Sequence, residues 1–581
     1  MEGYARTALA RMLTTVGADP ELAGALETVA EQVPLLETLL TALGPVVGRL
    51  LQVAIGLGGR AAAGTVSLGE AEQELRTDGR EILCQALQAV TDAASAAEER
   101  RPGGVDGPDG VRRRRVEDGH ARSVATVFGR IAVRRIAYRA PGAANVHPLD
   151  EVLDLPAGLY SPGLARLCVR ESVRGSFTDA EDAIEDATGV RIGTRQIIEL
   201  ARAAARDAAA FYADRCRDLP APGPDDALVI TADGKGIPVR PEALRPGTAK
   251  LAAKAKAKAK AEAGAEATSP AGGGIGGGDG KGSRKRMAEL VCVYDVAPVP
   301  RTVEDILPAV VRGDGGGAST GPSTLGHGDG DSDSDSDGDG QEPTVVKAPK
   351  AAGKWLTASV VEDIPTVIAA GFDEATRRDP GHARHWLALV DGNTTQIDAI
   401  TAEAAARGVD ITILVDYLHV AGYVWDAAKA FFCTDTPAGM ARARAWVHER
   451  KRMILHGRAL EVADRIRARV QGSKLSAAQR KSALEAATYL TNKAPYLDYP
   501  TALANGWPIA TGVIEGACRH LVADRLEITG ARWGLDTAQA ILTLRAITTN
   551  SDFDDYWRYH QQQEHDRTYP GTARTEPALA A

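Results

Sequence analysis

Short apolar runs alternate with amphipathic stretches between residues 227 and 420, once two low-complexity segments are set aside. Runs of four to eight residues rich in branched side chains predict strands, whereas apolar positions at helical spacing predict helices. The expected strands are ALVITAD, MAELVCVYDVAP, KWLTASVV, HWLALVD and ITILVD, and the expected helices are DIPTVIAAGFDEATRR and TTQIDAITAEAAARG. The sequence therefore predicts three consecutive strands, followed by helix, strand, helix and strand, in an α/β domain.

This order is typical of the ribonuclease-H-like sheet, in which antiparallel strands come first and parallel strands after. In such a sheet the carboxyl ends of the first and fourth strands are neighbours, and Asp233 and Asp391 occupy these two ends. Taken singly, an Asp-Gly pair after a strand is an ordinary turn signal. Taken together, the two aspartates predict a shared site for Mg²⁺ or Mn²⁺, since these hard cations bind carboxylate oxygens.

Glu515 is the third candidate ligand, in the segment ATGVIEGACRHL, whose helix is expected to begin near Pro508. A lone Glu on a helix is more often solvated or ion-paired. Here basic residues follow it, and arginines can hold phosphates while a carboxylate holds an ion. The candidate DNA contacts after Glu515 are Arg519, Arg525, Arg532 and Trp533. A place in the core is the plainer interpretation of Trp533.

Asp416 ends the fifth expected strand and begins DYLHV, followed by a helical insertion over residues 417–505. An aspartate there has a second interpretation, as the cap of the following helix. We treat Asp416 and His419 as alternative or supporting site residues. The sequence leaves open whether Asp391 or Asp416 is the second metal ligand.

The part of the chain before residue 226 predicts two further regions. Residues 1–100 are rich in Ala, Leu and Glu at helical spacing and predict a helical region. Its most apolar stretch begins at Pro34 and contains Glu37 and Arg49. These charges predict a packed or partner-binding helix rather than a membrane span. In residues 105–215, SVATVFGRIAVRRIAYRA predicts a hairpin around Phe128-Gly129. Its outward arginines could face phosphates or simply solvent: Arg130, Arg134, Arg135 and Arg139.

The segment SFTDAEDAIEDATGVRIGTRQIIELARAA predicts a helix-turn-helix. Thr178 with Glu181 is a capping-box pattern, Gly189 ends the first helix, and Thr194 is expected to cap the second. The second helix begins with Arg195 and Gln196, side chains of the types that contact base edges in the major groove. Paired capped helices are common in all helical proteins, so the pattern alone does not establish DNA binding.

The formal net charge is −9, which would disfavour nucleic acid if it were evenly spread. Much of the acid lies in GHGDGDSDSDSDGDG, whereas Arg113 and Arg114 belong to a run of four arginines. The segments 248–282 and 313–342 lack the apolar residues that a folded core needs, so we expect disordered inserts there. Six cysteines without CxxC spacing indicate neither disulfides nor a zinc ribbon and favour the cytoplasm.

Several segments together resemble the DDE transposases of bacterial insertion sequences, most closely the ISKra group, which is related to Mutator-like enzymes. They are TADGKGIPVRPEAL, RKRMAELVCVYDVAP, LVDGN, ILVDYLHVAGYVWDAA and GVIEGACRHLVADRLEITGARW, within residues 110–550. The resemblance implies a ribonuclease-H-like catalytic domain over residues 226–550, two Mg²⁺ or Mn²⁺ ions, and a triad of Asp233, Asp391 and Glu515. The two long inserts depart from the family pattern, and residues 551–581 form a tail.

A transposase that cleaves and joins DNA is therefore the function that the sequence favours. Its expected partners are double-stranded DNA, both element ends and target, and further copies of the chain on that DNA; its expected location is the cytoplasm, with the nucleoid. One alternative is a transposase-derived DNA-binding protein without transfer activity, which the three intact carboxylates disfavour. Another is a carboxylate-dependent hydrolase such as a glycosidase, which the basic helix and the helix-turn-helix disfavour.

Overall fold

The structure, a computed structural model, describes residues 36–214, 223, 225–250, 285–308, 347–528 and 530–570. It divides into two compact units, Tyr212–Phe553 and Met1–Phe211 with Asp554–Ala581. Both units are mixed in secondary structure, so the expected multidomain α/β class is confirmed at that level. Residues 248–250, the start of the insert predicted at 248–282, are helical, which corrects the expected disorder there. The rest of that insert, the insert predicted at 313–342, the first 35 residues and the end of the tail lie outside the described residues.

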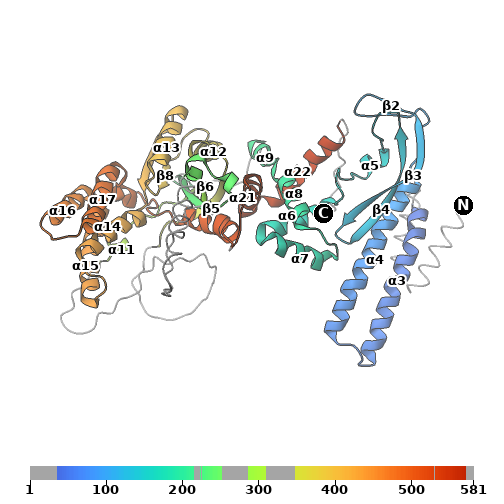
Figure 1. Cartoon of the computed structure of the whole chain (residues 1–581), viewed down its shortest axis with the longest axis horizontal. Helices are drawn as coiled ribbons and strands as arrows, with labels where there is room; N and C mark the ends of the chain where they lie inside the picture. The colour runs from blue at the N-terminus through green and yellow to red at the C-terminus, as the bar shows by residue number, and fades with distance from the viewer. Residues whose placement is uncertain are drawn as a thin grey trace, which may run out of the picture. The chain divides into compact units, whose positions relative to one another are not determined.

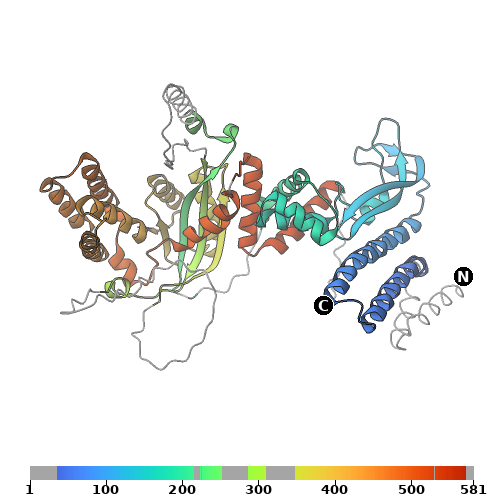
Figure 2. The same cartoon turned by 60° about the horizontal axis from the view of Figure 1, so that its bottom comes forward.

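A five-stranded mixed sheet is the centre of the unit Tyr212–Phe553 (Figures 1 and 2). Its strands stand in the order β7-β6-β5-β8-β9. The pairs β7-β6 and β6-β5 are antiparallel, whereas β5-β8 and β8-β9 are parallel. This is the order predicted from the alternation of apolar runs. The bounds are β5 Ala227–Pro238, β6 Lys285–Val296, β7 Ala351–Ser359, β8 Trp386–Val390 and β9 Ile411–Val415.

Helices cover both faces of the sheet. On one face Gly371 of α12 (Ile364–Arg378) leaves room for Ile230 and Val291, and α13 (Thr394–Arg407) packs beside α12. Alternate residues of a strand point to opposite faces, and Asp233 accordingly meets Cys518 on the other face. The elements on that other face are α19 Gly512–Ala517, the π-helical turn η3 Cys518–Ala523, α20 Asp524–Leu526 and α21 Leu535–Thr549.

The predicted insertion between the fifth strand and the Glu515 helix is helical, as expected (Figure 1). Alanine-rich apolar stripes hold its helices together, including buried Ala427, Ala463 and Ala486. The helix that carries Glu515 begins at Gly512 rather than near Pro508. The insertion contains α14 Tyr417–Phe431, α15 Pro437–Leu455, α16 Ala459–Gln471, α17 Ala477–Lys493 and α18 Tyr499–Ala504.

The other unit combines a helical pair, a hairpin and a cluster of short helices. Helix α3 (Leu36–Ala62) packs on α4 (Leu68–Ala96) through buried Val46, Val53 and Ile82, which confirms the packed helix expected there. No helix in the described part of the chain is long and apolar enough to cross a membrane. The remaining main elements are β3 Arg115–Thr126, β4 Gly129–Arg139, α6 Pro162–Arg174, α7 Phe177–Thr188, α8 Thr194–Ala205, α9 Ala208–Asp214 and α22 Phe553–Thr568.

Four local expectations need correction. The capping box of α7 is formed by Ser176 and Asp179, not by Thr178 and Glu181, because the polar pair two residues earlier matches the same pattern. The N-cap of α8 is Gly193, and Thr194 is its first helical residue. The expected tail begins as helix α22. The hairpin itself forms as predicted, with Thr126 opposite Gly129. The fourth correction concerns one of its arginines, Arg135.

Arg135 does not face solvent, although it was expected among the outward arginines. Alternate residues of a strand point to opposite faces, so Arg135 points away from exposed Arg134 and lies on the face of buried Ile131 and Val133. The buried Arg135 guanidinium donates to Asp150 Oδ1 at 2.6 Å. Arg130, Arg134 and Arg139 are exposed as expected.

Candidate active site and nucleic-acid-binding elements

Strands β5 and β8 bring two predicted residues side by side, although Asp233 does not end its strand as predicted. Ala232 is the last β5 residue paired with β8, and its partner is Val390. Asp391 directly follows the end of β8, whereas β5 continues past Asp233 to Pro238 because it stays paired with β6. Asp391 Oδ1 accepts a hydrogen bond from the backbone N–H of Asn393 at 2.7 Å, which leaves its second oxygen free of that turn.

Asp233 has a constrained and partly desolvated carboxylate. Its Oδ1 accepts from the Gly234 N–H at 2.6 Å, and its Oδ2 accepts from the Cys518 thiol at 3.3 Å. Burial raises the pKa of Asp233, and the nearby carboxylates of Asp391 and Glu515 raise it further. Three acidic groups from distant parts of the chain therefore repel one another at this point. A bound cation would relieve that repulsion.

Glu515 reaches this cluster from α19, on the face of the sheet where Cys518 lies. The residue is exposed. The Thr511 hydroxyl, one turn earlier, lies 3.3 Å from Glu515 Oε1 and 2.6 Å from Asp416 Oδ2. The helix then changes to the π-helical turn η3, a rare geometry that often occurs at functional sites. The predicted triad is thus on one side of the sheet end.

Asp416 takes both of the roles left open by its sequence position. It is the N-cap of α14, with Oδ1 accepting from the Leu418 N–H at 2.8 Å. Its side chain also accepts from Thr511, which links it to Glu515. Asp416 is only 1% exposed, and burial raises its pKa. Asp416 is thus buried and set back, whereas Asp391 is partly exposed and directly follows the β8 residue paired with Ala232, so Asp391 is the better placed ligand and Asp416 the better placed support. His419 is exposed and lies edge-on to Tyr423.

The three triad carboxylates do not converge on a single point. Within the described residues, the ligand atoms of Asp233, Asp391 and Glu515 do not all lie within 4.8 Å of one another. Two ions in a phosphoryl-transfer site lie about 3.5–4 Å apart, with Mg²⁺–oxygen distances of about 2.0–2.1 Å, so ligands on opposite ions can be about 8 Å apart. The donor set, all carboxylate oxygen, suits Mg²⁺ or Mn²⁺.

Glu289 is a nearby carboxylate that the sequence analysis missed. It lies on β6 directly opposite Gly234 and is 8% exposed. A Cβ atom at Gly234 would lie 3.0 Å from Glu289 Oε2, so glycine makes room for this side chain. Burial raises the pKa of Glu289; Arg245 opposes the shift, and Asp233 and Asp391 add to it. The available signal was a single acidic residue inside the apolar run MAELVCV.

A second acidic group lies in the other unit and has a structural explanation. Ligand atoms of Asp207, His560 and Glu564 lie within 4.8 Å of one another. The Arg567 guanidinium donates to both Asp207 oxygens at 2.8 Å, and His560 Nδ1 lies 2.6 Å from Oδ2. The cation required by these acids is therefore already present as Arg567, and the network joins α22 to the end of α8.

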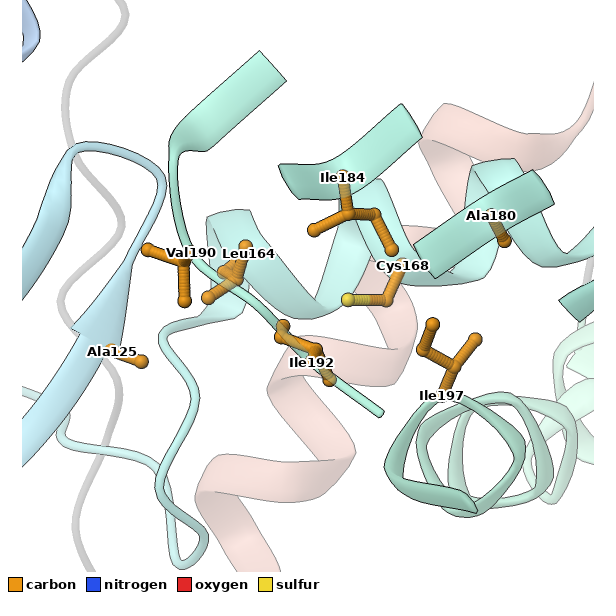
Figure 3. Close-up of a cluster of buried hydrophobic side chains, with 8 residues drawn as sticks. All are labelled: Ala125, Leu164, Cys168, Ala180, Ile184, Val190, Ile192 and Ile197. Carbon is orange, nitrogen blue, oxygen red and sulfur yellow. The ribbon is translucent and has the colours of Figure 1, made fainter. Parts of the chain in front are cut away.

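The predicted helix-turn-helix forms around a compact apolar core (Figure 3). Gly189 ends α7 in the left-handed region at φ 68°, and Val190 and Ile192 of the following loop are buried. Burial of these loop residues fixes the two helices against each other. Side chains from β3, α6, α7, the loop and α8 share this core: Ala125, Leu164, Cys168, Ala180, Ile184, Val190, Ile192 and Ile197.

The start of α8 presents the polar residues proposed for base contacts. The Arg195 side chain is 86% exposed, and Gln196 is also exposed. Arg195 pairs with Glu199 at 3.1 Å on the same helix. Exposed ion pairs of this kind contribute little free energy, so Arg195 can leave Glu199 and bond to a DNA acceptor instead at little cost in stability. These two side chains remain the candidates for recognition.

Alanine at Arg195 or Gln196 should relax sequence preference. Each lost base contact is expected to reduce discrimination by about 1–3 kcal/mol. Selection of bound sequences from a random duplex pool measures this for the full chain. Arg202→Ala, further along α8, is the matched control and should leave the selected sequence unchanged. An identical selected sequence for all variants would contradict a recognition role for α8.

The neighbours Arg113 and Arg114 have different environments. The predicted phosphate contact of Arg113 is therefore wrong, whereas that of Arg114 stays a prediction. Arg113 is 1% exposed, and its guanidinium donates to both Asp109 oxygens, at 2.7 and 2.8 Å, and to the Ala144 carbonyl at 2.7 Å. The hydrogen bonds from Arg113 lower the pKa of Asp109 to about 2. Arg113 therefore stabilises the loop, and exposed Arg114 remains available for phosphate.

Arg113→Ala and Arg114→Ala should have opposite consequences. Loss of the buried Arg113 hydrogen bonds should lower the free energy of unfolding by about 1–3 kcal/mol. Arg114→Ala should leave stability unchanged but weaken binding to all duplexes and reduce the salt slope by about 1. Chemical denaturation and salt-dependent DNA binding distinguish the two. Equal stability of both variants would contradict this assignment.

The basic residues after Glu515 also divide into two groups. Arg519 and Arg532 are exposed, as a phosphate contact requires. Arg525 and Trp533 are buried, the guanidinium lying 4.9 Å from the ring centroid, and the indole N–H donates to the Leu526 carbonyl. The proposed DNA contacts of Arg525 and Trp533 are therefore not supported. Their burial depends on η3 and β5, which sequence spacing does not reveal.

Without divalent ions, Asp233→Asn should be more stable than the wild type at neutral pH. Folding raises the pKa of Asp233, so protonated Asp233 stabilises the folded protein at a pH below the unfolded pKa. This stabilisation is lost as the pH rises through the folded pKa. Removing a charge repulsion of about 1 kcal/mol should raise the melting temperature by about 2 °C. Calorimetry at neutral pH and pH 3 measures the difference, which should vanish at pH 3. A lower melting temperature for the variant at neutral pH would refute this.

No protein-family model matches this chain, and no curated protein matches it.

Proposed function

We propose that this protein is a DDE-type DNA transposase with a ribonuclease-H-like catalytic core. The observation that carries the proposal is the meeting of three carboxylates where the pairing of β5 with β8 ends: Asp233 within β5, Asp391 just after β8, and Glu515 on α19. The sheet order β7-β6-β5-β8-β9, with β5 and β8 adjacent, also supports it. The segments that resemble insertion-sequence transposases contain these same residues.

In this proposal Asp233 and Asp391 hold the ions from the sheet, and Glu515 holds them from α19. Bound Mg²⁺ or Mn²⁺ ions supply Lewis acidity at the scissile phosphate and a nucleophile at neutral pH. The Thr511 hydroxyl donates to Asp416 and also lies 3.3 Å from Glu515 Oε1, so Asp416 and Thr511 together set the surroundings of Glu515. Cys518 restricts the rotamer of Asp233. No covalent enzyme intermediate is needed, so water and then a freed 3′-hydroxyl attack directly.

The partner in this proposal is double-stranded DNA. Arg195 and Gln196 on α8 read the element end, while Arg114, Arg519 and Arg532 contact phosphates. All five are exposed. Joining two element ends to one target requires at least two active sites, so we propose a homodimer or larger assembly on DNA. The expected location is the cytoplasm, in association with the nucleoid.

Incubation of the purified protein with labelled element ends and Mg²⁺ tests the function. We expect cleaved strands with 3′-hydroxyl ends, followed by their joining to a target plasmid. Sequence-specific retention without cleavage would favour a transposase-derived DNA-binding protein. Absence of both retention and cleavage would leave the carboxylate-dependent hydrolase as the better proposal.

A further inference from the structure

An open groove lies between α14 and α17 in the helical insertion. Its volume is about 900 Å³, which is within the range of ligand-binding sites. Tyr423 is the lining residue from α14, and the other eight lie on the exposed side of α17. The lining residues are Tyr423, Ala477, Arg480, Lys481, Leu484, Glu485, Thr488, Tyr489 and Asn492.

One end of the groove is joined to the candidate active site. The Tyr489 hydroxyl donates to the backbone carbonyl of Asp391 at 3.0 Å. Gly392 has φ 93°, and a Cβ atom there would lie 2.5 Å from the Tyr489 oxygen. Only glycine allows this close approach and this backbone conformation together. A DNA strand with its scissile phosphate at Asp391 would therefore pass directly beside Tyr489.

The groove offers an aromatic surface at that end. The rings of Tyr423 and Tyr489 stack with centroids 3.8 Å apart and planes 16° apart, and His419 lies edge-on to Tyr423. Both tyrosines are half-buried and line the groove, so part of each ring is accessible there. Stacked aromatic rings of this kind accept an unpaired base of any sequence.

The charges of the groove suit a phosphate backbone. Arg480 and Lys481 are both exposed, and the acidic residue in the lining, Glu485, lies 3.8 Å from Lys481. The lining thus has two cations and one anion, a net positive surface. Asn492 adds an amide that can bond to base edges. Arginine, lysine and aromatic rings in one groove are the combination that binds single strands.

We propose that the groove between α14 and α17 binds unpaired nucleotides of the DNA strand next to the scissile phosphate. The inference rests on the proposed function for the position of that phosphate at Asp391. In it the base nearest the active site stacks on an outer face of the Tyr423–Tyr489 pair, and Arg480 and Lys481 hold the following phosphates. The ligand is single-stranded DNA, because a paired base has no free face for the tyrosine rings.

Photocrosslinking with the full chain tests the inference directly. The probe is an oligothymidylate with one 5-iodouracil base, used as a single strand and as a duplex of the same sequence. We expect crosslinks to Tyr423 or Tyr489 from the single strand and none from the duplex, located by mass spectrometry of the peptides. Crosslinks confined to residues outside the groove would overturn the proposal.

Affinity measurements on three variants complete the test. Tyr423→Leu should weaken binding of the single strand about 5-fold or more, and Arg480→Ala with Lys481→Ala should weaken it and reduce its salt dependence. Arg444→Ala, exposed on α15 and absent from the groove lining, is the matched control and should bind as the wild type does. Tyr489→Phe keeps the ring, so it should retain the crosslink and serves as a second folded variant.

The two proposals fail in different ways. Metal-dependent cleavage of element ends together with unchanged single-strand affinity in Tyr423→Leu and the Arg480/Lys481 variant would overturn the groove alone. Crosslinking at Tyr423 or Tyr489 in a protein that never cleaves DNA would overturn the transposase while the groove stands.

Discussion

Replacing Asp233 or Asp391 with Asn, or Glu515 with Gln, should abolish metal-dependent DNA cleavage and strand transfer while DNA binding persists. Each change keeps the side-chain size but removes the charge that holds a divalent ion. Loss of groups that merely orient metal ligands costs about 10–100-fold, so loss of a ligand should cost about 100-fold or more. Cleavage of labelled element ends at fixed Mg²⁺ measures the loss, and gel retention without metal measures binding.

Asp398→Asn is the matched control for these variants. Asp398 is exposed on α13, seven residues after Asp391, and belongs to no carboxylate cluster among the described residues. It should cleave at the wild-type rate. Cleavage at that rate by Asp391→Asn would remove this residue from the triad.

Asp416→Ala should lower both stability and activity, whereas Asp416→Asn should lower activity alone. Alanine leaves the Leu418 N–H and the Thr511 hydroxyl without their acceptor. A lost cap and a lost buried hydrogen bond together should cost about 2–4 kcal/mol. Asparagine can still accept from Leu418, but its amide changes the link to Glu515, so we expect a loss of about 10–100-fold in cleavage. Denaturation and cleavage measured on both variants test this.

The outcome of these substitutions also decides between the two aspartates. Full activity in Asp391→Asn with none in Asp416→Asn would make Asp416 the second ligand. The structure favours Asp391, because Asp416 is buried whereas Asp391 is partly exposed and lies next to the β8 residue paired with Ala232.

The strand order and the closeness of Asp233 and Asp391 could be predicted from the sequence, because strand patterns are local and β5 and β8 are adjacent in the sheet. The end of β5 could not be predicted, because its pairing with β6 extends the strand past Asp233 to Pro238. Helix starts were harder to predict. Ser176 with Asp179, and Thr178 with Glu181, both fit the capping-box pattern. Packing around Phe177 and Ile184 selects between them.

Burial of charged residues could not be predicted because it depends on distant partners. Arg113 needs Ala144, Arg135 needs Asp150, and Arg525 needs Trp533. Glu289 joins the acidic cluster only because β6 places it opposite Gly234. The groove in the insertion requires α14 and α17 to pack, which no local pattern reveals.

The central claim is that Asp233, Asp391 and Glu515 bind divalent ions at one place. Anomalous diffraction from crystals soaked in Mn²⁺ tests this most directly. We predict anomalous density between the Asp233 and Asp391 carboxylates, with a second ion close to Glu515, and loss of both in Asp233→Asn. Saturating Mn²⁺ with no density at these carboxylates, or with density that persists in Asp233→Asn, would contradict the claim.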